Sequence, residues 1–301
     1  MQKYKRKAMA IYLISGGSGT IGSSLKESLE NEGNEVRVLS RSTNKKGFYK
    51  WNIKESFIDE RALQNVDHIV HLVGAGIADK RWSNKRKEEL LESRTKSTQL
   101  LIDVVSEMET KPKSVVCASA IGYYGMVTNS HIYSENDPAD SGFICDLVEK
   151  WETHTLQFKS LNIPTSIIRI GVVLSKRGGA VSKMIAPPIM APLGNGKQWV
   201  PWISVTDLVS VFKWCLKERK DDIYNGVASE HINNSELTKA LAKKYGKPYV
   251  NRGVPAFLLK LILGEMYQIV FEGSRVSSAK LKNQGFVFKH DTLKKAINDL
   301  F

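Results

Sequence analysis

The chain has 301 residues, of which 42% are hydrophobic and 25% are charged, and these proportions are ordinary for a soluble globular protein. No run approaches the ~20 apolar residues that a membrane-spanning helix needs, and the chain has no low-complexity segment or internal repeat. The formal net charge of +13 favours acidic partners such as a phosphate-rich cofactor, whereas nucleic-acid binding is not expected because no recognised motif for it is present.

The first predicted elements are a short apolar strand and the glycine-rich loop that follows it. The loop carries Gly16, Gly19 and Gly22, which suit a tight turn, a close approach to a pyrophosphate and close packing of the next helix. An amphipathic helix and a second strand at 35–40 come next. The N-terminus of that helix favours an anion. This context predicts dinucleotide binding rather than an ordinary turn.

The end of the second strand indicates which dinucleotide binds. An NAD site commonly has an acidic residue here, but this chain has Ser40, Arg41 and Ser42. A guanidinium can form paired hydrogen bonds to a 2′-phosphate, and the hydroxyls can assist it. The sequence therefore predicts NADP rather than NAD, with a solvated surface arginine as the alternative.

Strand and helix patterns then alternate along the chain. Strands are expected at 67–73, 114–119 and 165–170, and helices at 83–108 and 142–161. Such alternation is typical of a parallel sheet covered on both faces. We therefore predict an α/β fold with a doubly wound parallel sheet.

The alternation of strand and helix patterns ends after Leu174, where glycine and proline become frequent. We interpret the later segments as a smaller, discontinuous C-terminal substrate lobe that closes over the cofactor domain. The predicted divisions are a basic extension at 1–8, a cofactor domain at 9–175 joined by 203–228, and a lobe made of 176–202 and 229–301.

Residues 254–270 form the most apolar stretch, interrupted by Lys260, Gly264 and Glu265. Core-packed helices are the favoured interpretation, and a membrane anchor is the alternative. We expect no membrane partner.

The cysteines and the N-terminal sequence indicate the cellular compartment in which the protein is expected. Cys117, Cys145 and Cys215 have neither metal-ligand spacing nor a secreted disulfide pattern. The basic start imitates a signal peptide, but its apolar stretch is too short. The expected location is cytoplasmic, with reduced thiols and no metal site.

Arg94 is an anomaly in the long predicted helix. Together with Leu90, Ser97 and Leu101 it recurs at spacings of three and four, so Arg94 falls within the buried stripe. A buried guanidinium needs a partner. That partner is either a carboxylate or a phosphate of the cofactor.

A set of short motifs, taken together and in order, resembles the extended, atypical branch of the short-chain dehydrogenase/reductase superfamily, of the NAD-dependent epimerase/dehydratase kind. The resemblance covers nearly the whole chain. The motifs are GGSGTIG at 16–22, LSR at 39–41, HLVG at 71–74, RW at 81–82, SR at 93–94, ASAIGYYG at 118–125, WE at 151–152, RIGVVL at 169–174, GG at 178–179, GNGKQ at 194–198, WI at 202–203, NG at 225–226 and GF at 285–286.

The resemblance implies a Rossmann-type domain with NADP at the carboxyl edge of the strands and a substrate in the smaller lobe. It places Glu89 and Arg94 near the cofactor, and Glu89 is a candidate carboxylate partner of Arg94. The remaining implied cofactor residues are Gly16, Gly19, Thr20, Ile21 and Gly22 at the pyrophosphate, Ser40 and Arg41 at the 2′-phosphate, and Leu72, Val73 and Gly74 at the adenine-ribose side.

The catalytic pattern of this superfamily is incomplete in the chain. Relatives use a Tyr with a Lys four residues later to exchange a proton with the substrate, and no Tyr here has such a Lys. Ser119 matches the superfamily serine that hydrogen-bonds the substrate oxygen. Tyr124 or its neighbour Tyr123 is the candidate phenol, although a strand-end cap and packing are the structural alternatives for these residues.

Two main functions remain open on this sequence, and nucleic-acid binding by the basic face is a third, weaker option. The first is an NADP-dependent oxidoreductase or epimerase acting on a nucleotide sugar or another small hydroxyl or carbonyl compound, with Ser119 orienting the oxygen and Tyr124 or water handling the proton. The second is a non-catalytic NADP-responsive binding protein. A homodimer is expected only by analogy with related folds.

Overall fold

The computed structural model describes residues 9–301, so the predicted basic extension at 1–8 lies outside the described residues. Its centre is an eight-stranded sheet in which every pair is parallel except β3 with β4. In spatial order the strands are β11 (Ile223–Gly226), β8 (Thr165–Ile170), β6 (Ser114–Ala120), β5 (His68–His71), β1 (Ile11–Ser15), β2 (Glu35–Ser40), β3 (Phe48–Asn52) and β4 (Phe57–Ile58).

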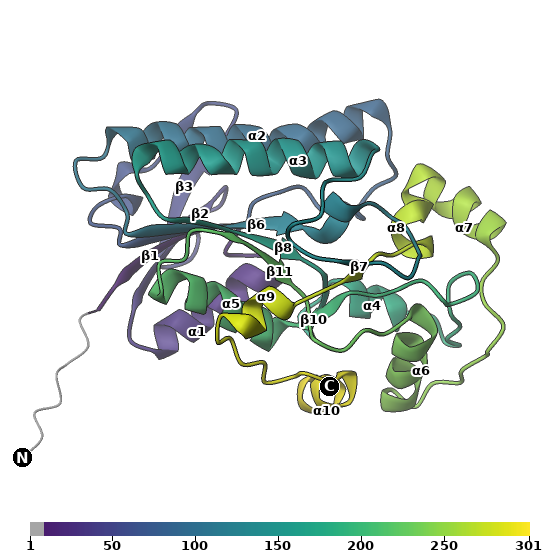
Figure 1. The fold of residues 1–301 in the computed structure, drawn as a ribbon. Helices are drawn as coiled ribbons and strands as arrows, with labels where there is room; N and C mark the ends of the chain where they lie inside the picture. The colour runs from purple at the N-terminus through teal and green to yellow at the C-terminus, as the bar shows by residue number, and fades with distance from the viewer. Residues whose placement is uncertain (1–8) are drawn as a thin grey trace, which may run out of the picture.

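Helices cover both faces of this sheet (Figure 1). One face carries α2 (Asn84–Glu107) and α3 (Phe143–Leu156), and the other carries α1 (Thr20–Asn31) and α5 (Val205–Lys217). The inner strands β5, β6 and β8 are buried along nearly their whole length, polar residues included, as expected of a parallel sheet covered on both sides. The predicted doubly wound α/β fold is therefore confirmed.

The strand order reverses between β1 and β5. From β1 the chain goes outward through β2 and β3, and from β5 it goes the other way through β6 and β8. Ligands of open α/β sheets bind at the carboxyl ends of strands at such a point. The fold therefore directs attention to the loops that follow Ser15 and His71.

The C-terminal part adds a second hydrophobic core beside the sheet. Leu237 and Leu241 of α6 (Asn234–Lys244) pack with Leu293 and Ile297 of α10 (Leu293–Leu300) and with Trp202. The further elements here are β9 (Val172–Leu174), α4 (Ala180–Met184), β10 (Trp202–Ser204), α7 (Ala256–Leu263), α8 (Gln268–Phe271) and α9 (Ala279–Asn283), with β7 (Ile132–Tyr133) pairing β12 (Arg275–Val276).

Short 3-10 turns complete the chain, and they shorten one predicted helix. The helix expected at 142–161 ends at Leu156, and a separate 3-10 turn runs from Gln157 to Leu161. The other 3-10 turns are η1 (Glu60–Ala62), η2 (Ile121–Tyr124) and η4 (Gly264–Tyr267). The predicted division into a cofactor domain and a lobe stays a prediction.

The prediction of core-packed helices at 254–270 is wrong for α7. Of its bulky side chains only Leu259 is buried, whereas Phe257, Leu261 and Ile262 are 65–72% exposed. Apolar residues occupy both sides of this helix, and only one side meets the protein. Within residues 9–301, no helix combines the length and hydropathy that crossing a bilayer requires.

Candidate functional site

The glycine loop joins β1 to α1 at the point where the strand order reverses. Gly16 has a φ of +76°, which L side chains rarely adopt. A Cβ atom on Gly22 would overlap the carbonyl oxygen of Gly16, so the first turn of α1 packs directly on the loop. Gly19 is the N-cap residue and provides no side-chain hydrogen bond. The backbone N–H groups in the first turn of α1 are therefore available to bind an anion.

A buried hydrogen-bond network ties the loop to its neighbours. Ser15 Oγ lies 2.6 Å from His71 Nδ1, and His71 Nε2 lies 3.1 Å from Thr98 Oγ1 of α2. Burial lowers the pKa of His71 to about 3, so the ring is neutral near pH 7. The backbone N–H of Leu72 donates to Ser15 Oγ at 3.3 Å. The network therefore links the ends of β1 and β5.

His71 was not predicted as a site residue. The HLVG motif at 71–74 pointed to this segment, but a histidine on an apolar strand gives no signal of its partners, which lie in other elements.

The end of β2 presents exposed cations. Ser40 Oγ accepts a hydrogen bond from the Ser42 N–H at 3.2 Å, and the Arg41 side chain is exposed. Lys45 and Lys46 are also exposed in the same turn, and residues 41–47 contain no acid. This turn therefore offers positive charge beside the glycine loop.

Arg94 is buried, as predicted, and among residues 9–301 it meets no carboxylate. Its guanidinium donates to the carbonyl oxygens of Leu90 at 2.8 Å and Ala75 at 3.2 Å, and it lies 4.9 Å from the Trp151 ring centroid. Its Nε has no partner within this part of the chain. Burial lowers the pKa of Arg94 to about 10, with a smaller effect of Arg86.

The predicted pairing of Glu89 with Arg94 is wrong. Glu89 forms an ion pair with Arg86 at 2.7 Å, and its side chain is 55% exposed. Residues five apart on a helix do not share a face, so Glu89 turns away from the buried side of α2. Arg94 instead packs against Gly74, where a Cβ atom would come 2.9 Å from the guanidinium carbon.

Ser119 stands at the carboxyl end of β6 in a buried network that contains charges. Its Oγ donates to Glu152 Oε1 of α3 at 2.5 Å. Arg169 of β8 donates to both carboxylate oxygens, at 2.9 and 2.8 Å, and this pair is almost completely buried. Burial alone would lower the pKa of Arg169, but its hydrogen bonds to Glu152 raise it above the ordinary value. The ion pair holds Ser119 in one orientation.

The two candidate tyrosines occupy different environments. Tyr124 is completely buried, its hydroxyl accepting from Arg169 Nη1 at 2.9 Å and donating to Asn225 Oδ1 at 2.7 Å. Burial raises the pKa of Tyr124 to about 12, although Arg169 acts in the opposite direction. Tyr123 is half-buried, and the Arg169 guanidinium carbon lies 3.4 Å from its ring centroid. Its hydroxyl has no hydrogen-bond partner in the described part of the chain.

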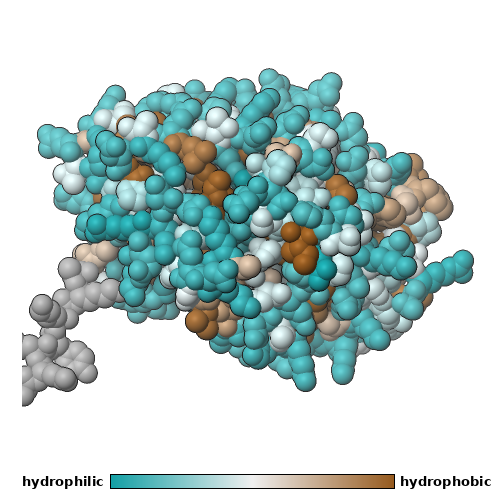
Figure 2. Space-filling view, in the orientation of Figure 1, coloured by the Kyte–Doolittle hydropathy of each residue, from teal (hydrophilic) through white to brown (hydrophobic). Residues whose placement is uncertain are grey.

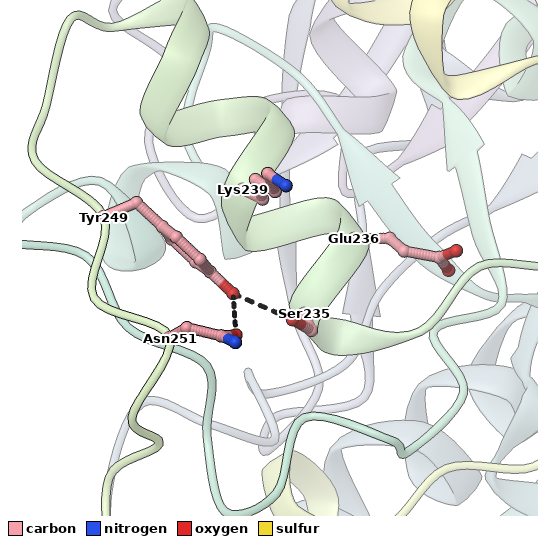
Figure 3. Close-up of a pocket in the computed structure, with 5 residues that line it drawn as sticks. All are labelled: Ser235, Glu236, Lys239, Tyr249 and Asn251. Carbon is pink, nitrogen blue, oxygen red and sulfur yellow. Dashed lines mark hydrogen bonds between the residues drawn. The ribbon is translucent and has the colours of Figure 1, made fainter.

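A separate hollow of about 370 Å³ lies at α6, away from these residues (Figure 3). Tyr249 Oη is 2.8 Å from Ser235 Oγ and donates to Asn251 Oδ1 at 3.4 Å. None of the sequence-predicted site residues lines it. The lining residues are Ser235, Glu236, Lys239, Tyr249 and Asn251.

A family model and a curated relative that match this chain both indicate an epimerase family. The model of the NAD dependent epimerase/dehydratase family matches residues 12–226, and a domain of unknown function (DUF1731) matches 254–300. An epimerase family protein of Staphylococcus aureus (strain MRSA252) is 33% identical, over 97% of this chain and 99% of its own.

Two solved structures are similar across almost the whole chain. The human epimerase family protein SDR39U1 (isoform 2), crystallised with NADPH, has a TM-score of 0.86 and 28% identity, covering 96% of this chain and 98% of its own. A nucleoside-diphosphate sugar epimerase of Corynebacterium glutamicum has a TM-score of 0.78 and 26% identity, covering 97% of this chain and 58% of its own.

Proposed function

The chain belongs to the NAD dependent epimerase/dehydratase family, and on that premise we propose that it is an NADP-binding oxidoreductase or epimerase. The observation that carries the proposal is the uncapped first turn of α1, packed on the glycine loop, next to the exposed Arg41 at the end of β2. The similarity to a human relative crystallised with NADPH supports the choice of cofactor.

The residues present fit such a cofactor. The glycine loop is tightly packed, since a Cβ atom on Gly17 or Gly22 would overlap its neighbours, and Arg94 is a buried cation without a carboxylate partner among residues 9–301. Bound NADP(H) would accept or supply a hydride. The residues that would hold it are Gly16, Gly19, Thr20, Ile21 and Gly22 at the pyrophosphate, Ser40 and Arg41 at the 2′-phosphate, and Leu72, Val73, Gly74 and Arg94 along the ribose side.

Ser119 would orient the reacting oxygen of the substrate. Because its own proton is donated to Glu152, Ser119 Oγ remains able to accept a hydrogen bond from a substrate hydroxyl. We assign the proton step to Tyr123 rather than Tyr124, since the Tyr124 hydroxyl is buried and already occupied on both sides. The substrate class we propose is a small hydroxyl or carbonyl compound such as a nucleotide sugar, in line with the Corynebacterium relative.

The cofactor proposal is tested by changing Arg41. Arg41→Ala should weaken NADPH binding about tenfold, because it removes a charge-assisted contact to the 2′-phosphate, and should leave NADH binding unchanged. Calorimetric titration of both dinucleotides measures this. Arg61→Ala, at an arginine that is 76% exposed in another turn, is the matched control. Equal losses for NADPH and NADH would contradict the role of Arg41.

The choice between the tyrosines is tested with phenylalanine variants. Tyr123→Phe should abolish turnover while leaving NADPH binding intact. Turnover is measured as NADPH consumption with a carbonyl substrate, or as formation of the epimeric product with a nucleotide sugar, since epimerisation consumes no net NADPH. Tyr124→Phe should retain turnover and lose stability, because Asn225 Oδ1 and Arg169 Nη1 each lose their buried hydrogen bond to the Tyr124 hydroxyl. The opposite result, with turnover lost only in Tyr124→Phe, would restore Tyr124 as the proton donor.

A second candidate is a non-catalytic protein that binds NADP and responds by changing its lobe. The absence of a Tyr with Lys four residues later favours it, together with the burial of Tyr124. NADPH binding without turnover of any nucleotide sugar or carbonyl compound, accompanied by a change in scattering profile, would support this candidate over the first.

A further inference from the structure

The outer side of α7 is an apolar surface that no part of residues 9–301 covers. The exposed side chains are Phe257 at 67%, Leu258 at 38%, Leu261 at 72% and Ile262 at 65%. They are spaced one, three and four residues apart, so they form one continuous stripe along the helix. We call these four residues the α7 face.

The α7 face differs from ordinary surface hydrophobics because its members are contiguous. The other large exposed apolar side chains of residues 9–301 are scattered over different elements. Figure 2 shows tan and brown atoms gathered at the right edge of the molecule, where Figure 1 places α7. The inner side of this segment is anchored separately, through the buried Leu259 and Met266. Contiguous exposed patches of this kind mark interaction sites.

Basic residues lie within and next to the segment that forms the α7 face. Lys260 lies within the helix, and Arg252 precedes it by a few residues; both are exposed and have no carboxylate within 4 Å in the described part of the chain. The Arg81 guanidinium lies against Gly264 at the end of α7. The nearby acid Glu265 is neutralised by Lys87 at 2.6 Å. The surroundings of the stripe are therefore basic, as is the whole chain at +13.

We propose that the α7 face docks on an anionic lipid surface. Bulky apolar side chains on a short protruding helix, with lysine and arginine beside them, suit the boundary between lipid headgroups and acyl chains. The basic residues complement anionic headgroups. A second copy of the chain fits less well, because two copies would bring the same positive charges together.

This proposal revises the expectation of no membrane partner. It concerns a surface on a different element from those that form the candidate cofactor site, so it does not depend on the proposed function. Attachment here is peripheral, with the helix lying in the plane of the surface.

Vesicle co-sedimentation tests the proposal with the full chain. The unmodified protein should sediment with phosphatidylglycerol-containing vesicles and remain in solution with pure phosphatidylcholine vesicles, and added salt should weaken the binding. Leu261→Glu should reduce the bound-to-free ratio at least about tenfold, and Lys260→Gln should reduce it about fivefold. Val287→Glu, at a valine that is 85% exposed elsewhere, should bind as the unmodified chain does.

Circular dichroism on each variant establishes that these exposed substitutions leave the fold intact. Failure of the unmodified protein to bind anionic vesicles would overturn the proposal, as would equal binding by Leu261→Glu. Light scattering tests the alternative that a second copy of the chain covers the α7 face. A dimer that Leu261→Glu dissociates would support that alternative and overturn the lipid proposal.

Discussion

Two buried polar networks lie at the same edge of the sheet, and they differ in whether the nearby buried arginine is paired with a carboxylate. The cofactor-side network joins Ser15, the neutral His71 and Thr98, and it lies beside a helix whose buried Arg94 has no carboxylate partner among residues 9–301. The substrate-side network neutralises itself, because Arg169 binds both oxygens of Glu152. The cofactor side therefore keeps a positive charge that can bind an anion. The substrate side holds the Ser119 hydroxyl in place by an ion pair that carries no net charge.

The largest expected effect on stability comes from breaking the ion pair between Glu152 and Arg169. Glu152→Gln leaves Arg169 as a buried charge without its counter-ion, which costs about 3–5 kcal/mol of unfolding free energy. Urea unfolding measures this loss. Replacing both partners with apolar residues, as in the Glu152→Leu and Arg169→Met double variant, should recover much of the stability. A loss below about 1 kcal/mol for Glu152→Gln would show that the pair is not a buried ionic unit.

The neutral His71 gives a comparable effect, which appears as a dependence of the unfolding free energy on pH. The pKa of His71 in the folded state, about 3, lies below the ordinary value of 6.5, so the unfolded chain binds the proton first. Its contribution is fully present above pH 6.5 and is lost as the pH falls towards 3, at up to about 1.4 kcal/mol per pH unit.

His71→Asn should therefore flatten the dependence of unfolding free energy on pH in this window. Chemical unfolding at several pH values compares the two slopes, and the other titrating groups contribute equally to both proteins. Identical slopes would mean that the pKa of His71 is the same in the folded and the unfolded chain.

The smallest of these effects concerns Arg94, the buried cation that has no carboxylate partner among residues 9–301. Arg94→Met should weaken NADPH binding about tenfold by removing positive charge beside Gly74, while unfolding free energy changes by about 1 kcal/mol because only two backbone hydrogen bonds are lost. Calorimetric titration and urea unfolding of the same preparation measure both quantities. Unchanged NADPH affinity with altered stability would make Arg94 purely structural.

The sequence predicts what depends on local spacing. The glycine loop, the alternating strands and the burial of Arg94 all follow from periodicity along one segment, and the structure has each of them. The predicted pairing of Glu89 with Arg94 was wrong at the same level, because helical spacing favours Arg86, three residues from Glu89, over Arg94, five residues from it.

The remaining features depend on distant parts of the chain. Tyr124 is buried because Asn225 and Arg169, from β11 and β8, reach its hydroxyl. Similarly, the apolar content of 254–270 gave no information about which side of α7 the protein covers. Such pairings are set by tertiary packing, which no local pattern encodes.

The most direct test of the account is calorimetric titration of the unmodified protein with NADPH and then with NADH. We expect saturable binding of NADPH, with clearly weaker binding of NADH, because a basic turn and an uncapped helix N-terminus meet at one end of the sheet. Absence of any binding heat with NADPH across several temperatures, or tighter binding of NADH, would contradict it.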